Sequence, residues 1–236
     1  MDGETGGRLE RRARRLRMGR RLGGERLLFL AARLLYHLTV EGAEHIPTAG
    51  PCLFPFNHVS QPADLLANAL IRRHRSDVYL FGWQGLQGQN PLAQFLAGLG
   101  EVDPERRLLR AYKARGLSAG ELLRAYRLLG QGAAIAIAAE GEITWDGRLQ
   151  RPLAPGTAWL ALRTAAPVVP VVSSGGYDVQ PRWQMEKIRL TGRITLRVGQ
   201  PFTLCDAPVA RPSEQVLQAA NERLWQAMAA LVDESV

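Results

Sequence analysis

Short apolar runs alternate with longer amphipathic stretches along most of the chain. Strands are predicted where apolar runs are too short for helices or alternate with polar residues, at 53–56, 78–82, 133–139, 168–172 and 194–198. Apolar positions at helical spacing predict helices over 63–73, 92–99, 118–129, 157–164 and 213–232. Strands that alternate with helices indicate an α/β protein whose central sheet is mostly parallel or mixed and is flanked by helices.

The predicted strand at 53–56 contains Pro55, which has no amide hydrogen to donate to a neighbouring strand. Proline inside a sheet is confined mostly to edge strands and to bulges. An edge or bulge position is therefore predicted for this strand.

The first 38 residues differ in composition from the rest of the chain. Eight arginines fall between residues 8 and 21, and an apolar run over 27–38 follows, interrupted by Arg33 and His37. Guanidinium groups suit phosphate-bearing partners, and the apolar run is shorter than the roughly 20 residues that cross a bilayer. A basic arm next to an apolar helix is typical of an interfacial membrane anchor.

Two interpretations of this N-terminal segment compete. In the first, the arginines contact an anionic membrane surface and the helix enters its acyl boundary, so the protein is peripheral or monotopic on the cytoplasmic face. In the second, the helix packs on the domain core and the basic arm is a solvated tail. We favour the first, and divide the chain into a basic arm with a membrane-contact helix at 1–38 and a second domain at 39–236.

Composition narrows the class of protein further. The chain has 236 residues, of which 46% are hydrophobic, and a net charge of +8 that is carried almost entirely by arginine. Two cysteines, Cys52 and Cys205, fit a reducing compartment, and with four scattered histidines they give no structural zinc site. No metal or cofactor is expected. The first residues lack the charged, apolar and small succession of a secretory signal peptide, so no leader is expected.

The strongest candidate for chemistry follows the strand at 53–56. Asn57-His58 comes directly after this strand, and Asp64 lies a turn or so beyond. An imidazole paired with a carboxylate is the minimal general-base unit, because the carboxylate fixes the tautomer and stabilises the imidazolium. No Ser or Cys nucleophile is obviously paired with His58, so the base would activate a substrate hydroxyl.

A structural interpretation of the same residues is equally open at this point. Pro62 followed by Ala63-Asp64 is typical of a helix start, where a carboxylate is favourable beside the positive end of the helix dipole. His58 would then be a turn histidine without a chemical role. The decision between the two interpretations depends on residues further along the chain.

Four sequence blocks occur in order: Asn57-His58 with Asp64, Gly100-Glu101-Val102-Asp103 with Arg106, Glu140-Gly141, and Pro167-Val168-Val169-Pro170-Val171. Together they resemble the glycerolipid acyltransferases typified by 1-acylglycerol-3-phosphate O-acyltransferases, whose blocks are Asn-His-x4-Asp, Gly-x-x-x-Val-Asp-Arg, Glu-Gly-Thr and Val-Pro-Val. The similarity spans about residues 38–202. Each block alone is weak, and their shared order and spacing carry the resemblance.

The resemblance implies transfer of a fatty acyl group from acyl-CoA or acyl-carrier protein to a hydroxyl of a lysophospholipid or related glycerolipid, as in phospholipid biosynthesis. It implies His58 and Asp64 as catalytic residues, with backbone amides near the strand ends stabilising the oxyanion. It implies substrate binding by Asn57, Ser60, Arg106, Glu140 and Gly141. The expected partners are an anionic membrane surface, the acyl donor and a lipid acceptor.

Two departures from the family pattern bear on this activity. Five residues separate His58 from Asp64, where the family has four, so the turn at Gln61-Pro62 has to absorb one residue. Glu142 replaces the family's threonine, and a carboxylate near a phosphate subsite is repulsive unless an arginine offsets it. Arg106, Arg107 and Arg110 are the arginines expected to do so.

Two alternatives belong to other classes of function. The departures favour a catalytically weakened lipid- or acyl-carrier-binding homologue of the same fold. The arginine arm alone suggests a nucleic-acid-binding domain, but the chain has no aromatic interleaving and no recognisable reader motif, so no nucleic acid partner is expected.

Overall fold

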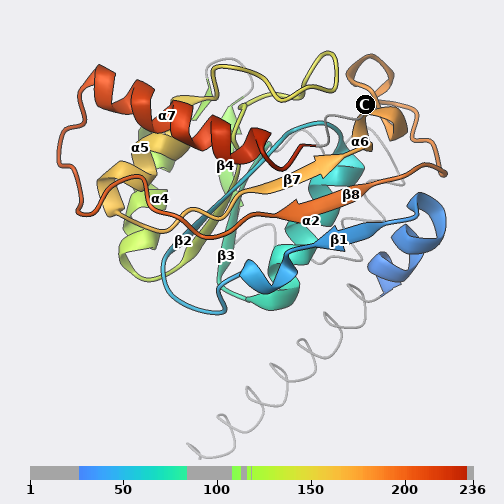
Figure 1. Ribbon diagram of the computed structural model, residues 1–236, viewed down its shortest axis with the longest axis horizontal. Helices are drawn as coiled ribbons and strands as arrows, with labels where there is room; N and C mark the ends of the chain where they lie inside the picture. Colours follow the sequence, from blue (N-terminus) through green and yellow to red (C-terminus); the bar gives the residue numbers. More distant parts are fainter. Residues whose placement is uncertain (1–26, 84–107, 113–115, 118, 233–236) are drawn as a thin grey trace, which may run out of the picture.

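The structure is a computed structural model that describes residues 27–83, 108–112, 116–117 and 119–232 (Figure 1). The arginine arm, the predicted helix at 92–99, and Arg106 and Arg107 lie outside the described residues.

The described residues form one mixed, eight-stranded sheet in the order β1-β8-β7-β2-β6-β3-β4-β5. Its strands are β1 (Thr39–Glu41), β2 (Cys52–Phe56), β3 (Val78–Trp83), β4 (Leu108–Tyr112), β5 (Gly116–Leu117), β6 (Ala134–Ala138), β7 (Val171–Ser174) and β8 (Thr195–Val198). The strands β7, β2, β6, β3 and β4 run parallel, and antiparallel pairs occur only between β7 and β8 and between β4 and β5 within the described sheet. The predicted α/β class is confirmed.

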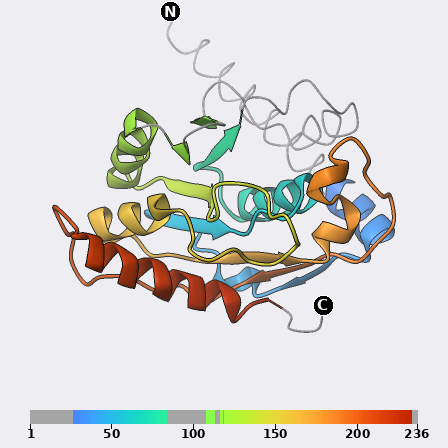
Figure 2. The same cartoon turned by 90° about the horizontal axis from the view of Figure 1, so that it is seen from above.

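Helices cover both faces of this sheet. The helices of the described segments are α2 (Gln61–His74), α4 (Ala119–Gly130), α5 (Pro155–Thr164), α6 (Gly176–Val179) and α7 (Glu214–Ala229), with short 3-10 helices η1 (Ala43–His45) and η3 (Arg182–Gln184). A further helical stretch, residues 27–36, precedes β1. One hydrophobic core lies under α2 and residues 28–36, and the other lies under α4, α5 and α7, the last two side by side in Figure 2.

The central strand β2 contributes to both hydrophobic cores. Cys52, Phe54 and Phe56 point to the core under α2, while Leu53 points to the core under α5. All five residues of β2 are buried, because a strand in the middle of a parallel sheet is covered on both faces. The end of β2 is thereby held rigidly, and His58 follows two residues later.

The predicted edge or bulge position of Pro55 is wrong. Its strand pairs with β6 along its whole length and with β7 on the other side. Pairing towards β7 is limited to Phe56 opposite Val171 and a single bridge from Leu53 to Val168, so the ladder is interrupted beside Pro55. Pro170 lies in the same interruption and delays the start of β7, which explains why this strand begins at Val171 rather than at the predicted residue 168.

The helix at residues 27–36 has one buried face and one exposed apolar face. Leu28, Phe29, Ala32 and Tyr36 are buried in the core under α2, which confirms that the helix packs on the fold. Leucines on the other face are exposed by 38–72%, namely Leu27, Leu30, Leu34 and Leu35. No helix within the described residues is long and apolar enough to span a bilayer.

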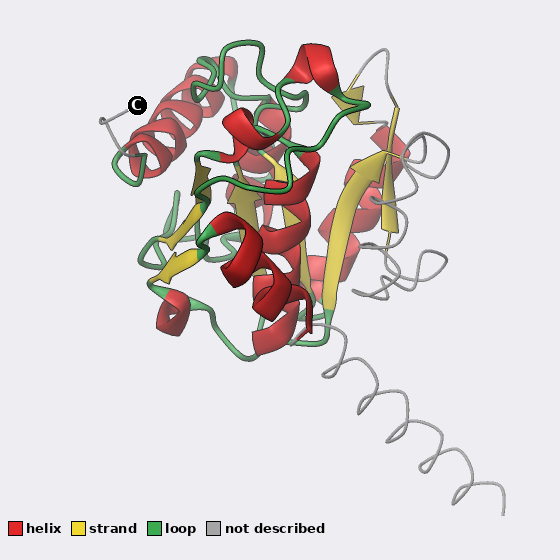
Figure 3. Ribbon diagram, turned by 90° about the vertical axis from the view of Figure 1, so that its right-hand side faces the viewer, coloured by secondary structure: helices red, strands yellow, loops and turns green. Residues whose placement is uncertain are grey.

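The strands β7 and β8 are antiparallel neighbours, yet 20 residues separate them in the chain. This connection, residues 175–194, contains α6 and η3 and is called the β7–β8 connection below. Gly176 allows it to press against the first turn of α2, since a Cβ there would come within 2.7 Å of the Ala63 Cβ. Figure 3 views the molecule from this side, where helices and loops lie in front of much of the sheet.

Candidate active site

The side chains of His58 and Asp64 meet at the carboxyl end of β2. His58 Nδ1 lies 2.6 Å from Asp64 Oδ2, with the two side chains 24% and 16% exposed. The Nδ1 atom and Asp64 Oδ1 are buried, so the solvent-accessible part of the imidazole lies elsewhere on the ring. A buried carboxylate on one ring nitrogen places the proton there and leaves Nε2 with a free lone pair. Such a pair can accept a proton from a bound hydroxyl.

The turn before α2 accommodates the additional residue between His58 and Asp64. Ser60 is extended and caps the helix, its Oγ accepting a hydrogen bond of 3.3 Å from Ala63 N. The helix begins at Gln61 with Pro62 in its first turn, where a missing amide hydrogen costs nothing. Asp64 is therefore the fourth helical residue and faces back towards His58. The five-residue gap does not separate the two side chains.

Asn57 and Ser60 are buried and bonded within the protein. Asn57 Nδ2 donates to Ser173 O at 2.9 Å, and its Oδ1 accepts from Ser173 N at 2.7 Å, which ties the end of β2 to β7. Exposed fractions of 4% for Asn57 and 0% for Ser60 leave these side chains to shape the turn that carries His58. That they bind substrate stays a prediction.

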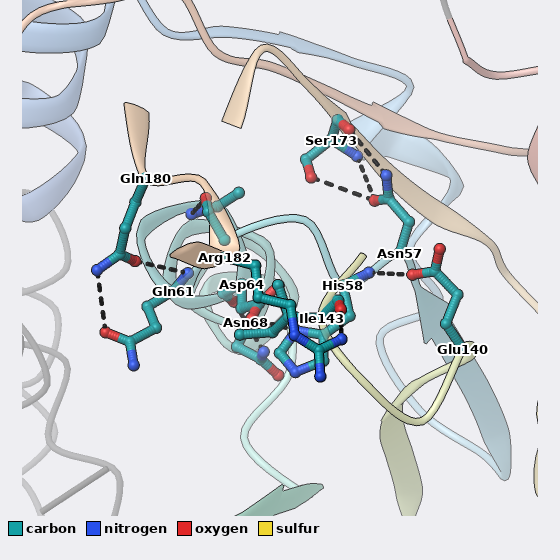
Figure 4. A network of polar contacts seen from close by, with 12 residues as sticks. Asn57, His58, Gln61, Asp64, Asn68, Glu140, Ile143, Ser173, Gln180 and Arg182 are labelled. Atoms are coloured by element: carbon teal, nitrogen blue, oxygen red, sulfur yellow. Dashed lines mark hydrogen bonds and ion pairs between the residues drawn. The ribbon is translucent and has the colours of Figure 1, made fainter. Parts of the chain in front are cut away.

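Glu140 connects the turn of His58 to the segment after β6. Its Oε2 accepts a hydrogen bond of 2.5 Å from His58 N (Figure 4), and its Oε1 accepts one of 2.9 Å from Gln150 N. Thr144 N in turn donates to His58 O at 2.9 Å. The backbone N–H and C=O of His58 are therefore both bonded to the segment 140–150, which fixes this segment against the histidine.

Gly141 and the nearby amides have internal roles. Gly141 adopts a φ of 79°, which favours glycine, and a Cβ there would come within 3.3 Å of the Ala154 Cβ. The amides of His58, Gly141 and Thr144 donate to Glu140, Ala138 and His58 respectively. These three amides are therefore not available to stabilise an oxyanion, so the predicted oxyanion role is not assigned to any of them.

Charge in the site raises the proton affinity of the imidazole. Burial lowers the pKa of His58, but the charge and contact of Asp64 and the charge of Glu140 outweigh it, so the pKa lies above its ordinary value. Burial raises the pKa of the Glu140 carboxyl, against the lowering effect of the amides of His58 and Gln150. Burial likewise raises the pKa of Asp64, and His58 opposes this.

Sequence reasoning missed Arg182, whose guanidinium lies beside the site. Arg182 Nη1 is 3.0 Å from Glu142 Oε2 and donates to Ile143 O at 2.5 Å. Among the described residues this arginine offsets Glu142, whereas Arg106 and Arg107 lie outside them and Arg110 is described only as part of β4. The available signal was a basic residue beside aromatic ones, Tyr177 and Trp183, in a long connection between strands.

Comparison with known proteins identifies the family and the fold of the chain. The acyltransferase family model matches residues 37–174, more than half of the chain. Nine chains of solved structures match, among them the 1-acyl-sn-glycerophosphate acyltransferase PlsC from Thermotoga maritima. That structure superposes with a TM-score of 0.58 at 22% sequence identity, over 88% of this chain and 76% of that one. No curated protein matches. The chain belongs to the acyltransferase family, as its ordered motifs predicted.

Proposed function

We propose that this acyltransferase moves a fatty acyl group from an acyl thioester, acyl-CoA or acyl-carrier protein, to a hydroxyl of a lysophospholipid or related glycerolipid. The observation that carries the proposal is the His58–Asp64 pair, 2.6 Å apart at the carboxyl end of a central strand. Ligands of open α/β sheets bind at this end of the strands. The structural similarity to an enzyme that is named for a glycerophosphate acceptor supports the choice of substrate class.

The proposed step needs no covalent intermediate on the protein. Nε2 of His58 removes the proton of the acceptor hydroxyl as its oxygen attacks the thioester carbonyl carbon, and Asp64 stabilises the imidazolium. The carbon–sulfur bond then breaks, and the imidazolium returns the proton to the departing thiolate. Products are an ester and a free thiol, and the histidine is ready for another cycle.

A small apolar groove lies against the first turns of α2, the helix that carries Asp64. It lies between residues 28–36, the first turns of α2 and Leu190, and apolar atoms line almost all of it. Leu65, the helical residue after Asp64, contributes to its wall, although neither His58 nor Asp64 lines the groove itself. We place the acyl chain of donor or acceptor there because apolar surface is its favourable environment.

The exposed leucines of residues 27–36 support membrane association. An exposed apolar helix face that also carries an exposed arginine, here Arg33, partitions into the interface of an anionic bilayer. We propose that this face lies on the membrane that supplies the lipid acceptor, with the protein peripheral or monotopic on the cytoplasmic side.

The test compares His58→Ala with His74→Ala. His74 lies in the last turn of the same helix that carries Asp64, where its Nδ1 contacts Leu70 O, so it is a matched histidine outside the site. Purified variants are assayed with acyl-CoA and acyl-carrier protein against several lyso-acceptors, and products are identified by mass spectrometry. His58→Ala should lose at least about 10²-fold in kcat, and His74→Ala should keep near-normal turnover.

Turnover close to the original in a folded His58→Ala variant would refute the base role. If the unsubstituted protein binds lysolipid or acyl-carrier protein without any transfer, the weakened binding homologue becomes the better description.

A further inference from the structure

Arg182, in the β7–β8 connection, lies near the catalytic pair without a direct bond to it. It begins η3, and its side chain is 25% exposed. The backbone beneath it is fixed to the turn of α2, because Gln180 Oε1 accepts from Gln61 N at 3.2 Å and Gln180 Nε2 donates to Met185 O at 2.8 Å. Figure 4 shows Arg182 beside His58 and Asp64, and its charge is one of those that act on the imidazole.

The guanidinium of Arg182 is fixed in place by the segment after β6. Nη1 contacts both Ile143 O and Glu142 Oε2. The guanidinium carbon lies 3.7 Å from the ring centroid of Trp145, a cation–π contact with a side chain that is itself 61% exposed. Tyr177, whose hydroxyl donates to Trp145 O and whose ring lies edge-on to Trp183, holds this segment against the connection. The guanidinium is therefore oriented before any substrate arrives.

These contacts use only one side of the guanidinium. Neither Nε nor Nη2 of Arg182 forms a hydrogen bond with the part of the chain that the structure describes. Nε–H and Nη2–H form the parallel pair of donors that binds phosphate or carboxylate oxygens in a bidentate manner. The pair stays unused although it belongs to an oriented cation next to the reactive histidine.

We propose that the Nε–Nη2 edge of Arg182 binds a phosphate group of a substrate, either the head group of the acceptor lipid or a phosphate of the acyl donor. This inference rests on the proposed function and assigns to Arg182 a substrate-binding role in the same site. Glu142 orients the guanidinium through Nη1, so the carboxylate that replaces the family's threonine stays compatible with an anionic substrate. Phosphate bound here fixes the acceptor or the thioester relative to His58.

The test measures kcat/KM for Arg182→Gln and Arg182→Lys with four substrate pairs. Lysophosphatidate or monoacylglycerol is the acceptor, and acyl-CoA or acyl-pantetheine is the donor, so that each phosphate is removed separately. The kcat/KM of Arg182→Gln should fall about tenfold to hundredfold with substrates that carry the bound phosphate, and less than about twofold with substrates that lack it. Arg182→Lys keeps the charge but loses the paired donors, so its loss should be intermediate.

The control variant is Arg189→Gln. Arg189 is exposed in the same connection and is not among the charges that act on His58, so its substitution makes the same change in net charge and should leave all four values unchanged. The substrate pair that abolishes the effect of Arg182→Gln identifies the source of the phosphate. An equal loss with all four pairs, or no loss with any, overturns the proposal while the acyltransferase function stands.

Binding of small phosphates gives a second readout that needs no turnover. Calorimetry with glycerol 3-phosphate and with CoA should show binding to the unsubstituted protein that Arg182→Gln weakens about tenfold or more. If the unsubstituted protein transfers no acyl group, the proposed function fails, and this measurement alone decides on the phosphate site. Equal affinities in the two proteins, or no binding in either, contradict it.

Discussion

Two arginines at opposite ends of the sheet differ in how much of each guanidinium the fold uses. Arg75, before β3, donates through Nε and Nη2 to both oxygens of Asp77, through Nη2 to Gly50 O and through Nη1 to Pro47 O. Its side chain is fully buried. Arg182, at the carboxyl end, is held through Nη1 and by a ring, and its Nε–Nη2 edge has no described partner.

The difference separates a structural end of the sheet from a chemical one. At the amino end of the strands, the guanidinium nitrogens of Arg75 donate to two carbonyl oxygens and a carboxylate, and these hydrogen bonds fix the loops. At the carboxyl end His58 keeps Nε2, and Arg182 keeps two donors, although both side chains are firmly held by neighbours. Groups that are oriented by the fold but not used up by it are the ones to which we assign substrate contacts.

The largest expected effect is on catalysis, in Asp64→Asn. The amide keeps the shape of the carboxyl group but cannot stabilise the imidazolium or hold the required tautomer, so kcat should fall about a hundredfold or more. Stability should change by less than about 1 kcal/mol, because burial already disfavours the charged carboxylate. Steady-state kinetics and chemical denaturation measure the two quantities. A large loss of stability with little loss of kcat would make Asp64 a structural residue like Arg75.

The next effect is on stability, in Arg75→Met. Methionine fills part of the volume but leaves Pro47 O and Gly50 O without their donor, so the free energy of unfolding should fall by about 2–4 kcal/mol. Activity per folded molecule should be retained, since the contacts lie at the amino end of the strands.

The control for this substitution is Arg211→Met, at an exposed position, which should change stability by less than about 0.5 kcal/mol. If Arg75→Met lowers kcat in molecules that remain folded, the division between a structural and a chemical end fails.

The smallest effect is on membrane binding, in Leu34→Gln. Leu34 is 72% exposed on the apolar face of residues 27–36, so its loss should leave stability nearly unchanged and weaken binding to anionic vesicles about threefold to tenfold. Leu123→Gln, an exposed leucine on α4, is the matched control and should leave vesicle binding unaltered. Equal effects of the two substitutions in a sedimentation assay would count against a specific membrane face.

Much of the fold could be predicted from the chain, and its exceptions have local causes. Apolar runs identified β2, β6 and β8 within one or two residues, and the helix periods identified α2, α4, α5 and α7. Pro55 was assigned to an edge or a bulge because proline cannot donate to a ladder, whereas its central position depends on pairing with β6 and β7, which are distant in sequence. The hydrophobic pattern of a single strand does not reveal which distant strands will pair with it.

The same limit applies to the site. His58 and Asp64 are six positions apart, so a helix start was enough to suggest that they meet. Glu140 came from the order of motifs, and its bonds to the amides of His58 and Gln150 are visible only in the fold. Arg182 lies 40 positions beyond Glu142, in a connection without regular periodicity, so its aromatic neighbours in the sequence could mark it as notable but could not place it near the histidine.

The most direct test of the account is the pH dependence of kcat/KM for the unsubstituted protein and for Asp64→Asn. A base must be neutral to accept a proton, and Asp64 and Glu140 hold the pKa of His58 above 6.5, so kcat/KM should rise with pH through a midpoint above that value. Without the Asp64 charge, burial dominates and the midpoint should move to lower pH, with a lower plateau. A flat profile, or a midpoint that Asp64→Asn leaves in place, would contradict the claim that this pair takes the proton.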